Sequence, residues 1–420
     1  MSLILSATRS EKAALTTTKW IVFLAAFLGW MFDGLEMGIF PLAARPALQH
    51  LLGVEGDAEV GKWMGIITAL FLVGAASGGL IFGWLGDRLG RVRSMVLSIL
   101  AYSIFTGCCY FVTAAWQLGV FRFLAALGMG GEWSLGVALV MECWPEQHRP
   151  LLAGAIGAAS NVGFGLIGLL GMQFQVTRDS WRWVMLAGAV PAVLALFIFQ
   201  FVPESERWKE SIKRGTSRPV REIFSSGLAK TTLLAIAFAS IALIGTWGSV
   251  QWLPLWADKL TGGKVPEAKA LTQVLSAGGA IIGCFLGPWI GGRMGRRPAY
   301  FFLCLGSLIS CALLFRAINQ YSAAFLWLVG CVGGMTAAFY GWLPLYLPEL
   351  FPTRVRATGQ GLTYNFGRIL AAVGALQMGQ LMSYYEGNYA KAGASITLVY
   401  LLGMVLIWFA PETKGKPLPE

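Results

Sequence analysis

Long apolar stretches alternate with short polar segments along almost all of the 420 residues. An α-helix needs about 20 apolar residues to cross the hydrocarbon core of a bilayer. Twelve stretches of about that length therefore predict an all-α membrane protein with twelve transmembrane helices, and the first is too long for a cleavable signal sequence. The stretches lie near 20–43, 61–85, 94–114, 117–142, 151–174, 183–202, 231–257, 270–291, 299–317, 322–347, 357–383 and 393–410.

The longest polar interval divides these stretches into two sets of six. Residues 203–230 contain two prolines and seven lysines or arginines, a composition typical of a linker. We therefore expect an N-terminal six-helix bundle in residues 1–202, a cytoplasmic linker in 203–230 and a C-terminal six-helix bundle in 231–420.

Composition and charge agree with a membrane protein. Charged residues make up 13% of the chain, against about 25% in soluble domains. The net charge of +11 comes from basic residues between the apolar stretches, so it indicates topology, and we find no nucleic-acid-binding motif. With a cytoplasmic N-terminus, cytoplasmic segments hold 21 of the 32 lysines and arginines and outer segments hold nine. This bias predicts that both termini are cytoplasmic and that the protein lies in the cell membrane, the inner membrane in a bacterium.

Other kinds of chemistry find little support in the sequence. The seven cysteines lie mostly within apolar stretches and lack metal-ligand spacing, so we interpret them as packing residues. The two histidines, His50 and His148, lie in loops, without a nucleophile constellation or a nucleotide-binding loop. We therefore expect no metal, no cofactor and no enzyme activity.

The two halves of the chain repeat. Three pairs of segments match at offsets of 205, 207 and 208 residues, which chance alone hardly produces. A tandem repeat of six helices with one orientation predicts two bundles around an axis along the membrane normal. The pairs are GWLGDRLGR (83–91) with PWIGGRMGR (288–296), ECWPEQHR (142–149) with ELFPTRVR (349–356), and Pro-Glu-Ser (203–205) with Pro-Glu-Thr (411–413).

The segment between the second and third spans carries a family motif. Its pattern G-x-L-x-D-R-x-G-R resembles that of the major facilitator superfamily, and the resemblance covers essentially the whole chain. In the second copy of the motif, Gly292 replaces the aspartate. The resemblance implies a secondary transporter with two six-helix bundles. The motif residues are Gly83, Leu85, Asp87, Arg88, Gly90 and Arg91.

Two branches of that family share features with the chain. PESERW (203–208) and PETKG (411–415) resemble sugar porters, but span seven reads TWGSVQWLPLW and lacks the paired glutamines that hold hexose hydroxyls. WMFDGLEMGIF, GMGGEWSLG and ELFPTRVRATGQGLTYNFGRI are more similar to the aromatic-acid and sialic-acid proton symporters. The second branch favours an organic-anion symporter.

The family resemblance implies a conformational latch at the cytoplasmic ends of the spans. Ion pairs and helix-end contacts there would hold the two bundles in one conformation. The alternative for the basic residues is that they only set the membrane topology through the excess of positive charge on the cytoplasmic side. An acid such as Asp87 contributes nothing to that excess. The expected latch residues are Gly83, Asp87, Arg88, Gly90, Arg91, Glu142, Arg149, Glu349, Arg354 and Arg356.

Two carboxylates interrupt the first apolar stretch. Asp33 and Glu36 are three residues apart and share one helix face, and each charge in lipid costs at least a few kcal/mol. Counted along the helices, Asp33 lies about 21 Å and Arg122 about 22 Å from the cytoplasmic surface. The resemblance implies that the two residues pair, and that protonation of Asp33 releases the pair during transport. A static ion pair that fixes helix register is the alternative.

Two further acids could serve the same process. Glu36, one turn beyond Asp33, is either an alternative partner of Arg122 or a residue in water at the mouth of the pathway. Glu132 follows three glycines in span four, near the middle of the membrane, where a charge is expensive. We interpret it as a second proton carrier or a substrate contact, with a structural hydrogen bond as the alternative.

The candidate substrate-binding residues surround an arginine of span eleven. Arg368 lies about 18 Å into the membrane, without an acid of its own span at that depth. Facing a cavity, it would bind a carboxylate through two hydrogen bonds, and the alternative is a partner on another helix. Aromatic and amide side chains suit a small, partly apolar ligand. The further candidates are Asn365, Tyr364, Trp247, Gln251, Tyr340 and Asn161.

Together these observations predict a proton-coupled symporter of a small carboxylate that works by alternating access. We expect protons, the substrate and the lipid bilayer as partners, no nucleic acid, and a monomer. A proton-coupled sugar or polyol symporter and a non-transporting sensor with the same fold are the alternatives.

Overall fold

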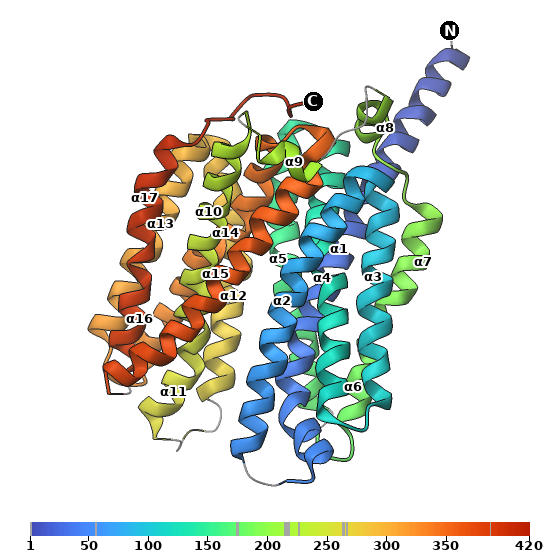
Figure 1. Ribbon diagram of the computed structural model, residues 1–420. Coiled ribbons are helices and arrows are strands. Elements are labelled where there is room, and N and C mark those ends of the chain that lie inside the picture. Colours follow the sequence, from blue (N-terminus) through green and yellow to red (C-terminus); the bar gives the residue numbers. More distant parts are fainter. Residues whose placement is uncertain are drawn as a thin grey trace.

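The computed structural model describes residues 2–54, 57–173, 176–213, 219–225, 227–262, 265, 268–386 and 388–420. Every regular element in these ranges is a helix, and the long helices run side by side (Figure 1). Both ends of the chain lie at the same end of the helices, which we call the termini end (Figure 1). The short helices α8 and α9, from the predicted linker, also lie there.

Two groups of helices make up the two halves of the molecule. The N-terminal half comprises α1 (Ser2–Leu52), α2 (Asp57–Leu89), α3 (Arg91–Cys108), α4 (Ala115–Cys143), α5 (Arg149–Gln173), α6 (Trp181–Ala187) and α7 (Pro191–Phe201). Between the halves come α8 (Glu206–Lys213) and α9 (Pro219–Ile223). The C-terminal half comprises α10 (Ala229–Gly248), α11 (Leu253–Thr261), α12 (Ala268–Met294), α13 (Arg296–Ala317), α14 (Ala323–Leu350), α15 (Arg356–Tyr384), α16 (Tyr389–Thr397) and α17 (Val399–Leu406).

Eleven of the twelve predicted spans are long and apolar enough, within the described residues, to cross a membrane. The remaining one corresponds to α15, whose 29 residues run the length of the C-terminal half (Figure 1). Three predicted spans are interrupted in the structure. Span six breaks between α6 and α7 at residues 188–190, just before Pro191, span seven contains a 3-10 turn at Val250–Trp252, and span twelve breaks at Leu398.

Small residues allow neighbouring helices to approach closely, as expected in lipid. A Cβ added to Gly78 of α2 would collide with the carbonyl oxygen of Leu127 in α4. At the repeat offset of 205 residues, a Cβ on Gly283 of α12 would collide with the carbonyl oxygen of Gly334 in α14. The two halves are therefore built with the same internal contact.

The halves meet mainly through two helix pairs, α2 with α15 and α5 with α12, and α5 also contacts α14 while α4 contacts α15. In the first pair, a Cβ on Gly83 would lie 2.7 Å from the carbonyl oxygen of Ala357. In the second, a Cβ on Gly154 would lie 3.0 Å from the carbonyl oxygen of Cys284. Both glycines lie in the half of their helix nearer the termini end, so the two halves are closely packed there.

Candidate functional site

A buried charge network joins the halves at the termini end. Arg91 Nη1 donates to Asp87 Oδ1 at 2.7 Å, and its Nη2 donates to Glu142 Oε1 at 3.1 Å. From the other half, Arg356 Nη1 donates to the same Glu142 oxygen at 2.8 Å. Arg91 Nη2 also reaches the backbone oxygen of Thr353 at 2.6 Å. All four charged side chains of this network are buried, so no solvent weakens their attraction.

Asp87 also binds the beginning of α15 directly. Its two carboxylate oxygens accept hydrogen bonds from the backbone amides of Ala357 at 3.2 Å and Thr358 at 2.8 Å. The first amides of a helix lack internal partners and carry partial positive charge. A carboxylate of α2 therefore caps a helix of the opposite half.

The C-terminal half repeats those contacts of the network that join residues of the same half. Arg296 binds both oxygens of Glu349, at 2.9 and 2.5 Å, whereas Arg91 binds one oxygen of Glu142. The hydroxyl of Thr413 donates to Glu349 at 2.5 Å, and Ser205 donates to Glu142 in the corresponding way.

The contact between the halves is not repeated. Gly292 stands where Asp87 stands in the first copy, so no carboxylate from this position can cap α5. The Nε and Nη1 atoms of Arg149 have no hydrogen-bond partner among the described residues, although Arg149 corresponds to Arg356. The predicted latch residues therefore come together around Asp87 but only in part around Gly292.

Two other predicted latch residues lie outside the network. Arg88 is exposed and its guanidinium lies 5.2 Å from the ring centre of Trp84. Arg354 forms an ion pair with Glu222 of α9. The motif predicted a shared role from sequence proximity, but α2 turns by about 100° per residue, so Asp87 and Arg88 point in different directions. Gly90 has φ 108°, which favours glycine at the turn into α3.

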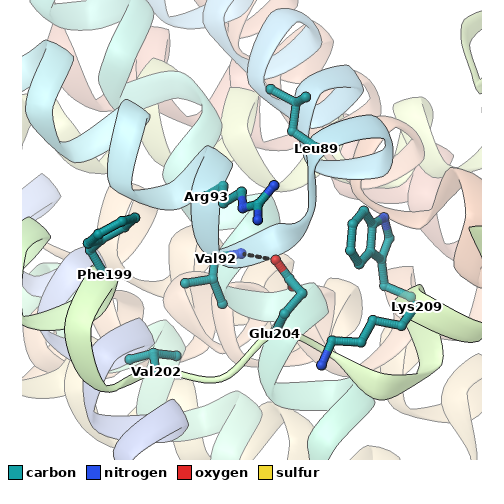
Figure 2. Close-up of a pocket in the computed structure, with 8 residues that line it drawn as sticks. Leu89, Val92, Arg93, Phe199, Val202, Glu204 and Lys209 are labelled. Atoms are coloured by element: carbon teal, nitrogen blue, oxygen red, sulfur yellow. Dashed lines mark hydrogen bonds between the residues drawn. The ribbon is translucent and has the colours of Figure 1, made fainter.

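A glutamate caps the helix after each motif. Glu204 accepts hydrogen bonds from the amides of Arg91 at 2.9 Å and Val92 at 3.1 Å, the second of which is drawn in Figure 2. Glu412 accepts from Arg296 at 2.9 Å and Arg297 at 3.1 Å.

The two caps differ in their electrostatics. Burial raises the pKa of Glu204, and the amides that donate to it offset burial only in part. Burial also acts on Glu412, but it is less deep, and the amides that donate to its carboxylate hold its pKa below the usual range.

Beside the Glu204 cap lies a cavity of about 330 Å³ (Figure 2). Arg93, Trp208 and Lys209 contribute to its lining, together with apolar side chains from α2, α3 and α7. It lies at the termini end and contains none of the predicted proton-coupling or substrate-binding residues.

A second cluster of charges lies deep within the helices. Arg122 of α4 forms an ion pair with Glu36 of α1, whose Oε1 also accepts a hydrogen bond from Thr106 at 2.8 Å. The guanidinium of Arg122 lies over the rings of Phe71 and Phe40, at 4.8 and 5.3 Å from their centres. Both charged groups are only 1% exposed.

The partner of Arg122 is thus Glu36, and the prediction that Asp33 fills this role is corrected for this conformation. Counting residues along a helix fixes depth only to about one turn, and Glu36 lies one turn beyond Asp33. Glu36 is also not a residue in water at the mouth of a pathway. The glycine at 188, in the break of span six, leaves room for it: an added Cβ would lie 3.1 Å from Glu36 Oε2.

Asp33 and Glu132 have a different environment. Both side chains are fully buried, and none of their four carboxylate oxygens has a hydrogen-bond partner among the described residues. Glu132 packs against Gly29, one turn before Asp33 on α1, where any Cβ would collide with its Oε1. The charges that act on Asp33 are those of Glu132, Arg368 and Glu36. Arg368 is the cation among them.

Arg368 is held by its own helix. Its Nη1 donates to Asn365 Oδ1 at 3.0 Å, and its guanidinium lies 5.1 Å from the ring centre of Tyr364. The amide of Asn365 in turn donates to the backbone oxygens of Gly130 and Gly361, both at 2.9 Å. Asn365 therefore positions Arg368. Since Gly130 belongs to α4, Asn365 also joins the two halves, and the sequence did not predict this second contact.

No hydrogen bond or ion pair to Arg368 comes from the remaining predicted substrate-binding residues whose side chains the structure describes. Trp247 is partly buried against the core of the C-terminal half. Tyr340 packs against α5, where a Cβ on Gly157 would collide with its backbone oxygen. Asn161 is partly buried. The side chain of Gln251 lies outside the described residues.

Sequence reasoning missed Trp133 and Trp30. Trp133 directly follows Glu132, and its ring stacks on Tyr364 with 4.2 Å between centres and 18° between planes. Trp30 lies on α1 with its ring centre 6.3 Å from that of Trp133. Their position beside Asp33 and Glu132 in the sequence was the only available signal.

Similarity to known proteins extends over nearly the whole chain. The family model of the Major Facilitator Superfamily matches residues 20–375. A metabolite transport protein of Haemophilus influenzae is 30% identical, over 95% of this chain and 98% of that protein. A cis,cis-muconate transport protein of Acinetobacter baylyi is 28% identical (97% and 98%), and the sialic acid transporter NanX of Escherichia coli is 27% identical (89% of each).

Solved structures show the same fold. The proton:xylose symporter XylE of Escherichia coli, bound to 6-bromo-6-deoxy-D-glucose, superposes with a TM-score of 0.78 over 96% of this chain and 98% of that chain. Its sequence identity is 17%, so this similarity concerns the fold alone.

Proposed function

The chain belongs to the Major Facilitator Superfamily, and we propose that it carries a small organic anion, a carboxylate, across the membrane together with protons. As a member of that superfamily it is a multi-pass membrane transporter and not an enzyme. We propose alternating access, in which bundles 1–202 and 231–420 rock about the central charges as a monomer.

The observation that carries the proposal is the unpaired state of Asp33 and Glu132 beside Arg368. Glu36 already neutralises Arg122, so Arg368 is the cation whose charge acts on Asp33, with Glu132 as the neighbouring acid. Among the described residues, neither acid has a hydrogen-bond partner. A substrate carboxylate at Arg368 adds one more negative charge at this place. Since like charges repel strongly where water is excluded, the anion binds well only after a proton neutralises an acid.

This arrangement links the two ligands in both directions. If protonation of Asp33 strengthens anion binding, the bound anion must strengthen proton binding by the same factor. The ion pair of Arg122 and Glu36 would then be a fixed support for α1 and α4, while Asp33 and Glu132 exchange protons. The muconate and sialic acid relatives are named for carboxylic acids, which supports this substrate class.

We further propose that the termini end faces the cytoplasm. Its segments hold 21 of the 32 basic residues. The network around Asp87 joins the halves at this end, so the structure would represent a state closed toward the cytoplasm. Opening requires that Asp87 leave the amides of α15.

Proton coupling can be tested with purified protein in liposomes that enclose a pH-sensitive dye. Candidate carboxylates and sugars are added outside, and internal acidification is recorded. We expect acidification with carboxylates, its loss in Asp33→Asn, and unchanged transport in Asp179→Asn, which alters an exposed acid in the same way. Protein-free liposomes measure the leak of weak acids through lipid.

Other outcomes would contradict the proposal. A response to sugars alone would favour a sugar or polyol symporter and exclude a carboxylate substrate. Carboxylate uptake without acidification, unchanged in Asp33→Asn, would leave a facilitator without proton coupling. Tight binding without any transport would point to a sensor.

The role of Arg368 has a separate test in the same liposomes. We expect Arg368→Gln to weaken carboxylate transport about 10- to 100-fold, because a hydrogen bond to a charged group contributes about 1.5–3 kcal/mol. Arg368→Lys keeps the charge but loses the two-pronged geometry, so its loss should be smaller. Arg316→Gln, at an exposed position, is the control. Equal transport by Arg368→Gln and wild type would place substrate elsewhere.

A further inference from the structure

An aromatic contact crosses the boundary between the two halves next to Arg368. Trp133 belongs to α4 and Tyr364 to α15, and their rings are nearly parallel, with 18° between planes and 4.2 Å between centres. Trp30 of α1 lies beside Trp133. Trp133 is 3% exposed and Tyr364 is 4% exposed, so in this conformation each ring covers a face of the other.

The contact coincides with the charges assigned to substrate and proton. The guanidinium of Arg368 lies 5.1 Å from the ring centre of Tyr364. The charges of both Arg368 and Asp33 act on the Tyr364 hydroxyl. Glu132 directly precedes Trp133 in the chain. A cation, an acid and two flat aromatic surfaces thus lie close together, and the charge of Glu132 acts on that acid, Asp33.

The stacked rings must separate when the halves move apart around the central cluster. Separation uncovers one face of Trp133 and one face of Tyr364, which are large apolar surfaces. Water covers such surfaces poorly, whereas a flat conjugated molecule restores an offset-stacked arrangement on them.

We propose that Trp133 and Tyr364 form a platform on which the substrate stacks, and that the substrate is a planar, conjugated carboxylate whose anionic end binds Arg368. This inference rests on the proposed carboxylate transport and narrows its substrate class. It selects the chemistry of muconate over that of a polyhydroxylated sugar acid.

The amide nearest to Arg368 supports this choice. Both hydrogens of the Asn365 amide are used by Gly130 and Gly361, and its oxygen is used by Arg368. Asn365 therefore has no amide hydrogen left for a substrate hydroxyl group.

The test compares pairs of acids that differ only in conjugation. In the liposome assay, cis,cis-muconate is paired with adipate, which has the same chain length, and benzoate is paired with cyclohexanecarboxylate. N-acetylneuraminic acid represents sugar acids. For wild type we expect half-saturation at about 3- to 10-fold lower concentration for the conjugated member of each pair, the range of a single aromatic stacking contact.

Variants locate the discrimination. Trp133→Leu and Tyr364→Leu keep an apolar side chain but remove a flat aromatic face. The ratio of half-saturation concentrations within each pair of acids should therefore fall toward one, while adipate transport persists. Trp133→Phe and Tyr364→Phe should keep most of the ratio. Trp327→Leu, at an exposed position of α14 outside this contact, should leave it unchanged. If Trp133→Leu does not reach the membrane, the Tyr364 variants and the wild-type ratios still decide.

Three results would overturn the inference. They are equal half-saturation for saturated and conjugated acids in wild type, preference for N-acetylneuraminic acid, and equal loss of both members of each pair in the leucine variants. In all three, carboxylate transport itself continues or falls uniformly, so the proposed function stands. Absence of any carboxylate-driven acidification would instead remove the proposed function and this inference with it.

Discussion

The two halves of the chain carry the same network at the termini end, but only one copy reaches across to the other half. In both copies an arginine of the motif binds a glutamate, a hydroxyl group donates to that glutamate, and a second glutamate caps the following helix. In the first copy, Asp87 additionally caps α15. The second copy has Gly292 at this position.

The second copy lacks the donor as well as the acceptor. By the repeat offset, the amide of Ala357, which Asp87 binds, corresponds to residue 150, which is proline and has no amide hydrogen. A Cβ on Gly292 would lie 3.2 Å from Pro150 Cγ, a tight contact. The internal network therefore stabilises each half, whereas the polar closure between halves is concentrated on the α2–α15 side.

The largest expected effect comes from Asp87→Asn. The change leaves the buried guanidinium of Arg91 with less negative charge and gives α15 a weaker cap, and breaking a buried ion pair typically costs about 3–5 kcal/mol. We expect the termini-end contact to open and transport to fall at least tenfold. Transport is measured in liposomes, and stability by the reaction of a thiol-specific dye with the buried cysteines, among them Cys109 and Cys284, during heating.

Arg88→Gln is the matched control, because Arg88 is the exposed neighbour of Asp87 in the same motif. It should transport normally. Comparable losses in both variants would mean that the motif acts through its net charge and not through the cap on α15.

A smaller effect is expected from restoring the missing contact. Gly292→Asp alone should add little stability to the closed state. The new side chain contacts Pro150, and only one backbone amide is available to it, whereas Asp87 binds two. Combined with Pro150→Ala it regains both partners and should stabilise the closed state by about 1–2 kcal/mol, the range of a helix cap. A double-mutant cycle measures this coupling from the unfolding temperatures of wild type, both single variants and the double variant.

Strict additivity in that cycle would contradict this account of the asymmetry. If the two substitutions are coupled, we also expect slower transport in the double variant. A second polar contact between the halves must then break in each transport cycle. Faster transport would mean that closure at the termini end does not limit the rate.

The smallest expected effect is a difference in pH dependence between the helix caps formed by Glu204 and Glu412. The pKa of Glu412 lies below its unfolded value, so its stabilisation is present above about pH 4.3 and is lost as the pH falls through the folded pKa. The pKa of Glu204 is raised, so its stabilisation is present below the unfolded pKa and lost as the pH rises through the folded pKa. At pH 7, Glu412→Gln should lower the unfolding temperature more than Glu204→Gln.

The same comparison repeated at pH 4 sharpens the result. The deficit of Glu412→Gln should shrink toward acid pH. The unfolding temperature of Glu204→Gln should match wild type most closely there, because glutamine resembles the protonated acid. A larger cost for Glu204→Gln at pH 7 would show that its hydrogen bonds to α3 outweigh its burial.

The sequence by itself determined the helical architecture, the repeat and the candidate charges. About 20 apolar residues have only one common way to cross a bilayer, so eleven of twelve spans could be read from length and hydropathy alone. Helical spacing also placed Asn365 next to Arg368, because residues three apart share a face. The substitution of Asp87 by Gly292 was visible as a departure from the motif.

Only the tertiary structure decided which of these residues meet. Depth along a span is one coordinate, and it did not distinguish Asp33 from Glu36 as partner of Arg122, since one turn separates them. Rotation about each helix axis is set by packing against distant segments. For that reason the structure alone brought Trp133 to Tyr364, and it alone brought Asp87 to the amides of α15, 271 residues away.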